Sequence, residues 1–288
     1  ATVRHDYAGE HWNVRTVLDA ANLNQNTAGF VEGYQAYKDN DLKKRNPNPN
    51  AYRDAWSVRL YSAASIALND TNTLTVTPYL RDNDMEFLQH YLPWQPVEEN
   101  AHDSLGLRAT VQTNTDTLRW INGIDVEHTN ASLKETQDED FSPNQPAGVH
   151  YDYQVNATGG AIYSQLRTQS DSPWEIDGGV RLEYTHYDYN NKTADGAPCG
   201  PAATNCRFYR PSDREDSFTD WSLNAGVSYS LKENHIAYLR LARGFRAPQA
   251  TELYRLQGGQ EMANLNSEKI DNIELGLRGD WLGTARYD

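Results

Sequence analysis

Apolar and polar residues alternate along most of this chain with a period of two. In residues 105–111, for example, Leu105, Leu107 and Val111 alternate with small or polar residues such as Arg108. Successive side chains of a strand point to opposite faces, so the alternation predicts strands with one apolar and one polar face. It recurs in residues 56–68, 118–127, 174–184, 221–229 and 272–281, and less clearly in residues 28–37 and 236–242, where apolar residues occur on both faces.

The expected strands are long. Many extend over about 10–14 residues, whereas an ordinary globular strand has roughly 5–6. A strand that crosses a bilayer at a tilt needs about 9–11 residues. This length is therefore typical of a membrane-spanning barrel.

The connections between the strands fall into two alternating classes. Short polar turns are expected near Asn24, residues 69–72, 114–116, 170–173 and 232–234, and Gly283. Long irregular connections are expected at residues 38–50, 82–100, 131–150, 189–217 and 244–267. Short periplasmic turns and long extracellular loops are typical of a bacterial outer-membrane barrel, whereas a soluble sandwich mixes its loop lengths.

Aromatic residues gather near both ends of the expected strands. A barrel needs such rings where it meets the two headgroup layers, although in a soluble sheet tryptophan is simply a large core residue. The belt near the short turns is expected to contain Trp120, Trp174, Tyr229, Tyr238 and Trp281, and the belt toward the long loops Trp12, Trp56, Tyr153, Tyr184, Tyr187 and Trp221.

The spacing of the short turns gives the number of strands. One hairpin and one long loop take up about 52 residues, which predicts about eleven strands and a twelfth beginning at Ala285. Outer-membrane barrels have an even number of strands and must close, because an open edge in lipid leaves backbone groups unpaired. We therefore expect residues 1–288 to be a truncated part of an all-β, antiparallel, up-and-down transmembrane β-barrel.

Composition and motifs narrow the possible functions. With 26 Lys and Arg against 40 Asp and Glu, the formal charge is −14, which argues against a nucleic-acid partner. The 18 Tyr, 7 Trp and 6 Phe are too many for a disordered chain. GxSxG, HExxH, Walker and CxxC motifs are missing, and the 8 His lack ligand spacing. We expect no catalytic residue, no metal site and no cofactor.

The two cysteines, Cys199 and Cys206, lie close together in a segment rich in glycine, proline and asparagine. We predict that they form a disulfide, with a reduced pair as the alternative. A zinc site would need more ligands than the neighbouring residues supply.

The most specific stretch is residues 237–260, AYLRLARGFRAPQATELYRLQGGQ. An N-L-x-x-E segment at residues 264–268 and IELGLRG at residues 273–279 follow it. Over residues 218–281 this order resembles the barrel domain of TonB-dependent outer-membrane receptors, in which a strand ending in (S/A)RGFRAP leads into ELY and later into ELGxRG. The resemblance implies a barrel of about 22 strands around a plug. This chain would then hold about 11–12 of the strands, with the plug domain and the C-terminal strands outside residues 1–288.

The resemblance also implies a function. Receptors of this family are ligand-gated transporters that take up a scarce nutrient, most often a ferric siderophore, across the bacterial outer membrane. The implied partners are the ligand, the TonB complex acting through the plug, and outer-membrane lipid and lipopolysaccharide. One alternative is a barrel enzyme such as a phospholipase, which requires a Ser–His pair near a strand end. Another is a soluble extracellular glycan-binding β-protein, which requires a chain that stays in solution without detergent.

Candidate ligand contacts lie in the expected long loops. Aromatic rings suit stacking on a catecholate or hydroxamate chelate, and arginines suit an anionic ferric complex. For each residue the alternative is a self-packed loop with solvated charges. The candidates are His90, Tyr91, Trp94, Arg207, Tyr209, Arg210 and Arg246.

Other charged residues have simpler interpretations. Acidic runs at residues 82–84 and 138–140 could bind Ca²⁺, and the basic run at residues 43–45 could contact lipopolysaccharide phosphates, but solvated loop charge explains each. The polar strand faces are expected to line the lumen, where opposite charges pair. They carry Arg59, Arg108, Arg119, Arg181, Arg240 and Arg278 with Glu127, Glu183 and Glu274.

Overall fold

The protein folds into one large antiparallel sheet with almost no helix. The computed structural model describes residues 1–169, 171–232, 234–281 and 285–287. A 12-stranded sheet follows the order of the sequence, apart from a separate two-stranded sheet formed by β9 and β12. The elements are β1 (Thr2–Ala8), β2 (Trp12–Asn26), η1 (Ala36–Lys38), η2 (Leu42–Lys44), β3 (Tyr52–Ala67), β4 (Asn72–Leu88), β5 (Val97–Asn114), β6 (Leu118–Gln137), β7 (Gly148–Thr168), β8 (Trp174–Asn191), β9 (Phe208–Tyr209), β10 (Arg214–Lys232), β11 (His235–Arg246), α1 (Ala250–Tyr254), β12 (Leu256–Gln257), β13 (Glu268–Trp281) and β14 (Ala285–Tyr287).

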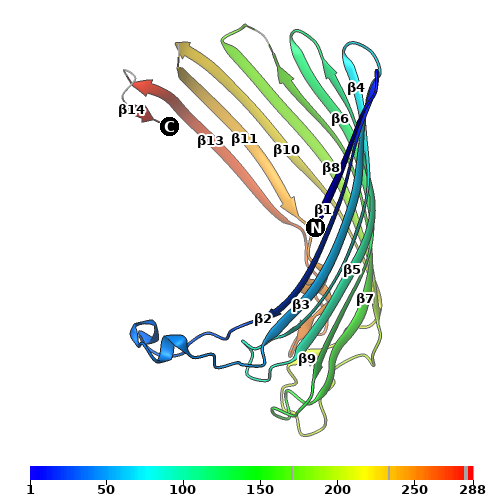
Figure 1. Ribbon diagram of the computed structural model, residues 1–288, viewed down its shortest axis with the longest axis vertical. Helices are drawn as coiled ribbons and strands as arrows, with labels where there is room; N and C mark the ends of the chain where they lie inside the picture. Colours follow the sequence, from blue (N-terminus) through cyan, green and yellow to red (C-terminus); the bar gives the residue numbers. More distant parts are fainter. Residues whose placement is uncertain (170, 233, 282–284, 288) are drawn as a thin grey trace.

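The large sheet curves round on itself, with short turns at one end and long loops at the other (Figure 1). The expected alternation of short and long connections is confirmed, as is the antiparallel up-and-down order. The expected twelfth strand at Ala285 corresponds to β14. The long loops are residues 27–51, 89–96, 138–147, 192–213 and 247–267.

The strands continue farther toward the long loops than the alternation indicates. β6 has 20 residues and β7 has 21. The connection expected at residues 82–100 is therefore reduced to 89–96, and that at 131–150 to 138–147. Beyond the hydrocarbon layer an outward-facing residue no longer has to be apolar. The backbone hydrogen bonds between strands therefore continue where the alternation of apolar and polar residues has stopped.

The prediction for the first hairpin is wrong. β2 runs through Asn24, so no turn occurs there, and residues 28–37 belong to a loop that contains η1. The short turn is at residues 9–11, where the Gly9 amide donates to the Trp12 carbonyl over 2.8 Å. The largely polar residues 22–26 resemble a turn in the sequence because they lie at the loop end of β2.

Apolar side chains on the outer face remain exposed. Leu105, Ile162 and Leu275 are 60%, 59% and 81% exposed, so no second protein layer covers them within the residues that the structure describes. An amphipathic sheet of a soluble protein would bury this face. The cross-strand register aligns Val76, Ala109, Ile124, Ile162, Leu182 and Trp221 in one row.

The inner face carries paired charges, as the alternation predicts. Arg181 lies 2.7 Å from both Asp125 and Glu183. Arg81 lies 2.6 Å from Glu127. Two of these pairs span an intervening strand and one lies within β8. Such paired charges stabilise this face, which would be unstable against hydrocarbon.

Tyrosine rings on the inner face lie across glycines of the next strand. A methyl group added at any of these glycines would lie far inside van der Waals contact with the ring, so the close approach requires glycine. The Cβ-to-ring distances would be 2.1 Å for Gly106 and Tyr79, 2.3 Å for Gly123 and Tyr163, and 2.4 Å for Gly276 and Tyr238.

Some aromatic residues do not belong to the belts in which we expect them. Tyr238 lies on the inner face, where it contacts Glu274 over 2.8 Å. Tyr153 is only 3% exposed and belongs to the inner-face core, against which Tyr187 packs. Trp12 begins β2 beside a short turn, so it lies at the opposite end from its expected belt. The period of two assigns a ring to a face and to a strand end only when the position of the strand relative to its turns is known.

Helices do not cross the membrane in this fold, because none in the described residues is long and apolar enough. The turn expected at Gly283, parts of those at residues 170–173 and 232–234, and the side chain of Trp281 lie outside the described residues.

Candidate functional site

Two long loops fold onto the inner face of the sheet. Residues 192–213 and 247–267 meet in the small sheet, where Leu256 pairs with Tyr209 and Gln257 with Phe208. We call this end of the sheet the mouth: the loops 89–96, 138–147, 192–213 and 247–267 with the strand ends that carry them. Its buried cluster contains Leu133, Tyr151, Tyr153, Val155, Tyr189, Phe208, Leu253 and Tyr254.

Helix α1 fixes the inward loop to this cluster. The helix begins with a capping box, in which the Gln249 amide donates to Glu252 over 2.8 Å. Leu253 and Tyr254 are fully buried, and the Tyr254 ring stacks on Tyr189 with 4.3 Å between centroids. Such short helices are not stable alone, so packing holds this one in place.

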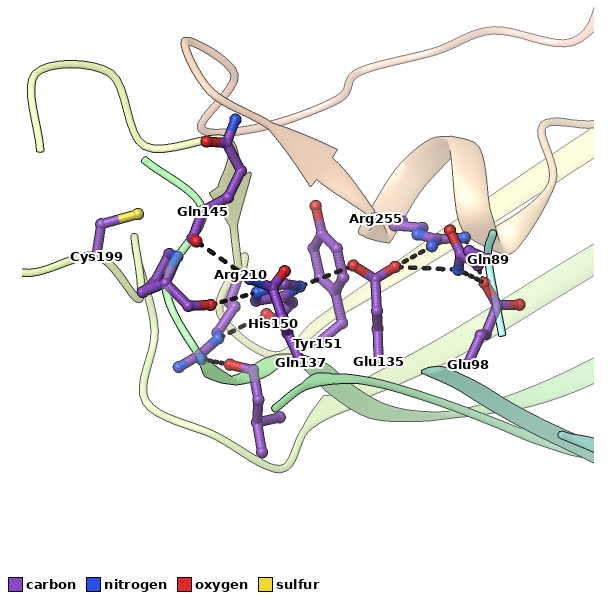
Figure 2. A network of polar contacts seen from close by, with 12 residues as sticks. Gln89, Glu98, Glu135, Gln137, Gln145, His150, Tyr151, Cys199, Arg210 and Arg255 are labelled. Atoms are coloured by element: carbon purple, nitrogen blue, oxygen red, sulfur yellow. Dashed lines mark hydrogen bonds and ion pairs between the residues drawn. The ribbon is translucent and has the colours of Figure 1, made fainter. Parts of the chain in front are cut away.

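Arg255, directly after α1, joins two buried carboxylates (Figure 2). It lies 2.9 Å from Glu98 of β5 and also contacts Glu135 of β6. The side chains of Glu98 and Glu135 are 9% and 2% exposed. Burial acts to raise the pKa of Glu135, but the hydrogen bond from His150 and the charge of Arg255 lower it overall. Glu135 is therefore ionised at neutral pH.

His150 of β7 completes this buried network (Figure 2). Its Nδ1 lies 2.9 Å from Glu135 Oε1, and its Nε2 lies 2.9 Å from the Pro146 carbonyl oxygen. The ring is fully buried and stacks on Phe208 of β9 with 3.7 Å between centroids.

Arg210 and Tyr209 are engaged inside the protein. Arg210 Nε donates to the His150 carbonyl over 2.9 Å, and Nη2 donates to the Val149 carbonyl. Burial lowers the pKa of Arg210. Tyr209 forms a ladder pair in the small sheet. Both hold loop backbone, and no contact of theirs points to a ligand.

A partly exposed group of rings and one cation lies elsewhere in the mouth. The Arg207 guanidinium lies 5.1 Å from the centroid of the Trp94 ring, and Phe141 lies 6.2 Å from that ring. His90 and Tyr91 form an edge-to-face pair at 5.8 Å, and Tyr91 is 51% exposed. We call Trp94, Phe141 and Arg207 the shelf.

The shelf leaves hydrogen-bonding capacity unused. Trp94 Nε1 and His90 Nδ1 are shielded from solvent and have no hydrogen-bond partner among the described residues. Arg207 forms no ion pair in the part of the chain that is described, whereas Arg255 contacts two carboxylates. In the sequence, His90, Tyr91, Trp94 and Arg207 share only their expected position in long loops, whereas the structure brings Trp94 and Arg207 into contact.

The loop backbone holds Arg207 in place. A disulfide joins Cys199 to Cys206, the residue before it. The Arg207 amide donates to the Asn144 carbonyl over 3.0 Å, and its carbonyl accepts from the Gly258 amide over 2.8 Å. Three loops therefore fix the position from which this guanidinium extends.

Arg246, the remaining candidate, is part of an ion-pair clamp. It lies 2.9 Å from Glu252 of α1 and 3.0 Å from Glu268 of β13. Those two hydrogen-bonded carboxylates raise the pKa of Arg246 and have their own pKa values lowered by it. The clamp connects both ends of the loop 247–267 and leaves no free charge for a ligand.

Below the mouth, the inner wall is hollowed. A cavity of about 300 Å³ is lined by residues that include Tyr79, Arg108, Asp125, Glu127 and Arg181. Arg108 contacts the Tyr79 ring at 5.4 Å but no carboxylate within the described chain. The wall therefore presents both paired and unpaired charge to whatever fills the lumen.

Sites of other kinds find little support. Among the described residues, no three His, Cys, Asp or Glu side chains are grouped to hold a metal ion. One Ser–His contact exists on the outer face, where His186 Nδ1 lies 2.9 Å from Ser217 Oγ. The other ring nitrogen of His186 has no carboxylate partner in the described ranges, so the third group of a triad is not supplied.

Comparison with known proteins identifies the family of this sheet. The family model described as "TonB dependent receptor-like, beta-barrel" matches residues 1–287. The chain belongs to this family. TonB-dependent receptors lie in the bacterial outer membrane, so the chain is a segment of an outer-membrane β-barrel. The long loops at the mouth are extracellular. A search of curated proteins found no match.

Solved structures show the same fold at low identity. The ferric citrate transporter FecA in the unliganded form has a TM-score of 0.71 and 14% identity over 97% of this chain and 40% of its own. The copper transporter OprC has a TM-score of 0.71 and 12% identity over 97% of this chain and 42% of its own. The ferric yersiniabactin uptake receptor FyuA from Yersinia pestis has a TM-score of 0.64 and 16% identity over 94% and 40%. The chain thus spans less than half the length of these three proteins.

Proposed function

We propose that this TonB-dependent receptor chain contributes about half of a barrel that takes up a scarce nutrient, and that its mouth binds an anionic ligand bearing planar groups. The supporting observation is the shelf, where Arg207 lies over a tryptophan at the extracellular end of the barrel and has no ion pair among the described residues. A ferric siderophore combines negative charge with planar chelating groups and fits this chemistry.

The remaining strands and the plug would be supplied outside residues 1–288. The matched share of about two fifths of FecA and FyuA supports this division. Arg108 lines the lumenal hollow, has no carboxylate partner in the described part of the chain and is suited to acidic groups on a plug. In this proposal the energy of uptake comes from the TonB complex acting through that plug. Outer-membrane lipid and lipopolysaccharide contact the apolar outer face.

The shelf is tested by ligand binding to the whole receptor. Ferric catecholate, hydroxamate and carboxylate chelates are titrated against the wild type and against Arg207→Gln and Trp94→Leu variants. Loss of a cation–ring and ion-pair contact of about 1–3 kcal/mol lowers affinity about five- to a hundredfold. Lys192→Gln, in the same loop as Arg207, removes an equal charge from an exposed position and is the control. Unchanged affinity in both shelf variants would reject the shelf as the site.

A second measurement tests the energy source. Uptake of the bound chelate by cells should stop when the inner membrane is de-energised, while binding at the surface persists. Uptake that continues under those conditions would contradict a TonB-dependent mechanism.

A further inference from the structure

His150 lies between two hydrogen-bond acceptors. Its Nδ1 faces the Glu135 carboxylate and its Nε2 faces the Pro146 carbonyl, each over 2.9 Å. A carboxylate and a backbone carbonyl can only accept, so both ring nitrogens must carry protons for both bonds to form. The geometry therefore requires an imidazolium, in a side chain that is 0% exposed.

The charges around this ring balance only in that form. Glu135 and Glu98 are the two buried carboxylates, and Arg255 and the imidazolium are the two cations in contact with them. A neutral His150 would leave two buried negative charges facing one positive charge. Buried charges are tolerated when they are paired, so loss of the proton destabilises the whole network.

Groups from every packed element face this ring. Glu135 of β6 contacts the ring directly, Arg255 at the end of α1 contacts Glu135, and Glu98 of β5 contacts Arg255 beyond it. From the loop 192–213, Phe208 stacks on the ring and Arg210 donates to the His150 carbonyl. The neighbouring Tyr151 donates its hydroxyl hydrogen to the Leu256 carbonyl, and burial raises the pKa of that hydroxyl, so it stays protonated.

Two extracellular loops thus contact the protonated ring directly, and a third is joined to it through Glu135. Pro146 belongs to loop 138–147, Phe208 to loop 192–213, and Arg255 reaches Glu135 from loop 247–267. We infer that His150 is a proton-dependent latch, which holds the loop 247–267 folded into the mouth while it is an imidazolium and releases that loop when it loses a proton.

Release would change the opening of the barrel. The latched loop packs α1 against the inner faces of β6, β7 and β8 at the mouth. When the His150–Glu135 or His150–Pro146 hydrogen bond is lost, the buried network that anchors the loop 247–267 is weakened. The stabilisation is present at low pH and disappears as pH rises, because the protonated form is the one with partners in the fold.

Hydrogen exchange on the full chain in detergent tests the latch without any ligand. Exchange of the peptide covering residues 250–258 is followed as pH is raised, after correction for intrinsic chemical exchange. We expect opening to increase about ten- to a hundredfold as His150 deprotonates, the effect of losing one charged hydrogen bond. In His150→Gln the opening should be high at every pH. His186→Gln, an exposed histidine on the outer face, should keep the wild-type pH profile.

A direct measurement covers the case in which the His150 variant fails to fold. Nitrogen-15 NMR of the histidine rings in the wild type should show both His150 nitrogens protonated while the loop is protected. A His150 ring with a single proton in the protected state would overturn the inference, as would a wild-type pH profile in His150→Gln. Neither result bears on ligand binding at the shelf, so the latch and the proposed function can fail separately.

Discussion

Replacing Arg255 by methionine removes the charge between two buried carboxylates while keeping a long, flexible side chain. Arg255 lies 2.9 Å from Glu98 and also contacts Glu135, whose side chains are 9% and 2% exposed. In Arg255→Met those carboxylates stay buried, because β5 and β6 hold them. Among the described residues, His150 is then the cation left in contact with Glu135.

The magnitude follows from that burial. Removing one partner of a buried ion pair costs about 3–5 kcal/mol. The Arg255 side chain is itself 26% exposed, so water reaches part of the pair and the lower end of that range applies. A cost of about 3 kcal/mol corresponds to roughly a hundredfold increase in opening of the loop 247–267, since each 1.4 kcal/mol is a factor of ten.

The assay is hydrogen exchange of residues 250–258 in the full chain at neutral pH. Lys134→Met is the matched control, because Lys134 is adjacent to Glu135 but forms an exposed ion pair with Glu99 over 3.2 Å on the opposite face. Exposed pairs contribute about 0–1 kcal/mol, so the control should change exchange less than about fivefold.

Equal changes of exchange in Arg255→Met and Lys134→Met would show that the buried charge of Arg255 does not hold the loop. A perturbation of the membrane-spanning strands as large as that of the loop would show that the buried network supports the whole sheet instead. A double variant, Arg255→Met with Glu135→Gln, should recover part of the protection by removing the uncompensated charge.

Two further predictions concern the inner wall and the acid limit of the network. Gly106→Ala should displace the Tyr79 ring, since the new methyl group would lie 2.1 Å from it, and should destabilise the barrel by about 1–3 kcal/mol. Thermal unfolding should show this, whereas Gly159→Ala, with nothing within 4 Å of the added carbon, should have little effect. The pKa of Glu135 is lower in the folded protein than that of an ordinary glutamate. Ionised Glu135 therefore stabilises the fold above the ordinary glutamate pKa, and this stabilisation is lost as pH falls through the lowered pKa. Exchange of residues 250–258 should therefore rise in acid, and an acid profile that is the same in Glu135→Gln would contradict this assignment.

The strand faces could be read from the sequence because lipid and lumen impose opposite demands on alternate residues. Leu105 and Ile162 remain exposed as the period of two requires, and Arg181 pairs with Asp125 on the other side. The strand ends could not be predicted, because outside the membrane the outward-facing residues are no longer required to be apolar. Residues 131–137 are still strand, yet their pattern is that of a loop.

The network at the mouth could not be predicted for a different reason. Arg255 and Glu135 are 120 positions apart, and Tyr151 and Leu256 are 105 apart. No local pattern records such contacts. The ELY segment before Arg255 marks the region through its family resemblance, but nothing in the sequence marks Glu135 or His150. Conversely, Arg210 and Arg246 look like free cations in the sequence and are held by backbone carbonyls and carboxylates in the structure.

The small sheet of β9 and β12 has a consequence for engineering new specificity. Its two strands come from different loops, so each loop supplies hydrogen-bond partners that the other requires. Grafting only one of the two from a related receptor would leave half of a ladder facing an unmatched surface. Ligand specificity should therefore be transferred between such receptors when residues 192–213 and 247–267 are transplanted as a pair. The two loops should also have changed together during evolution.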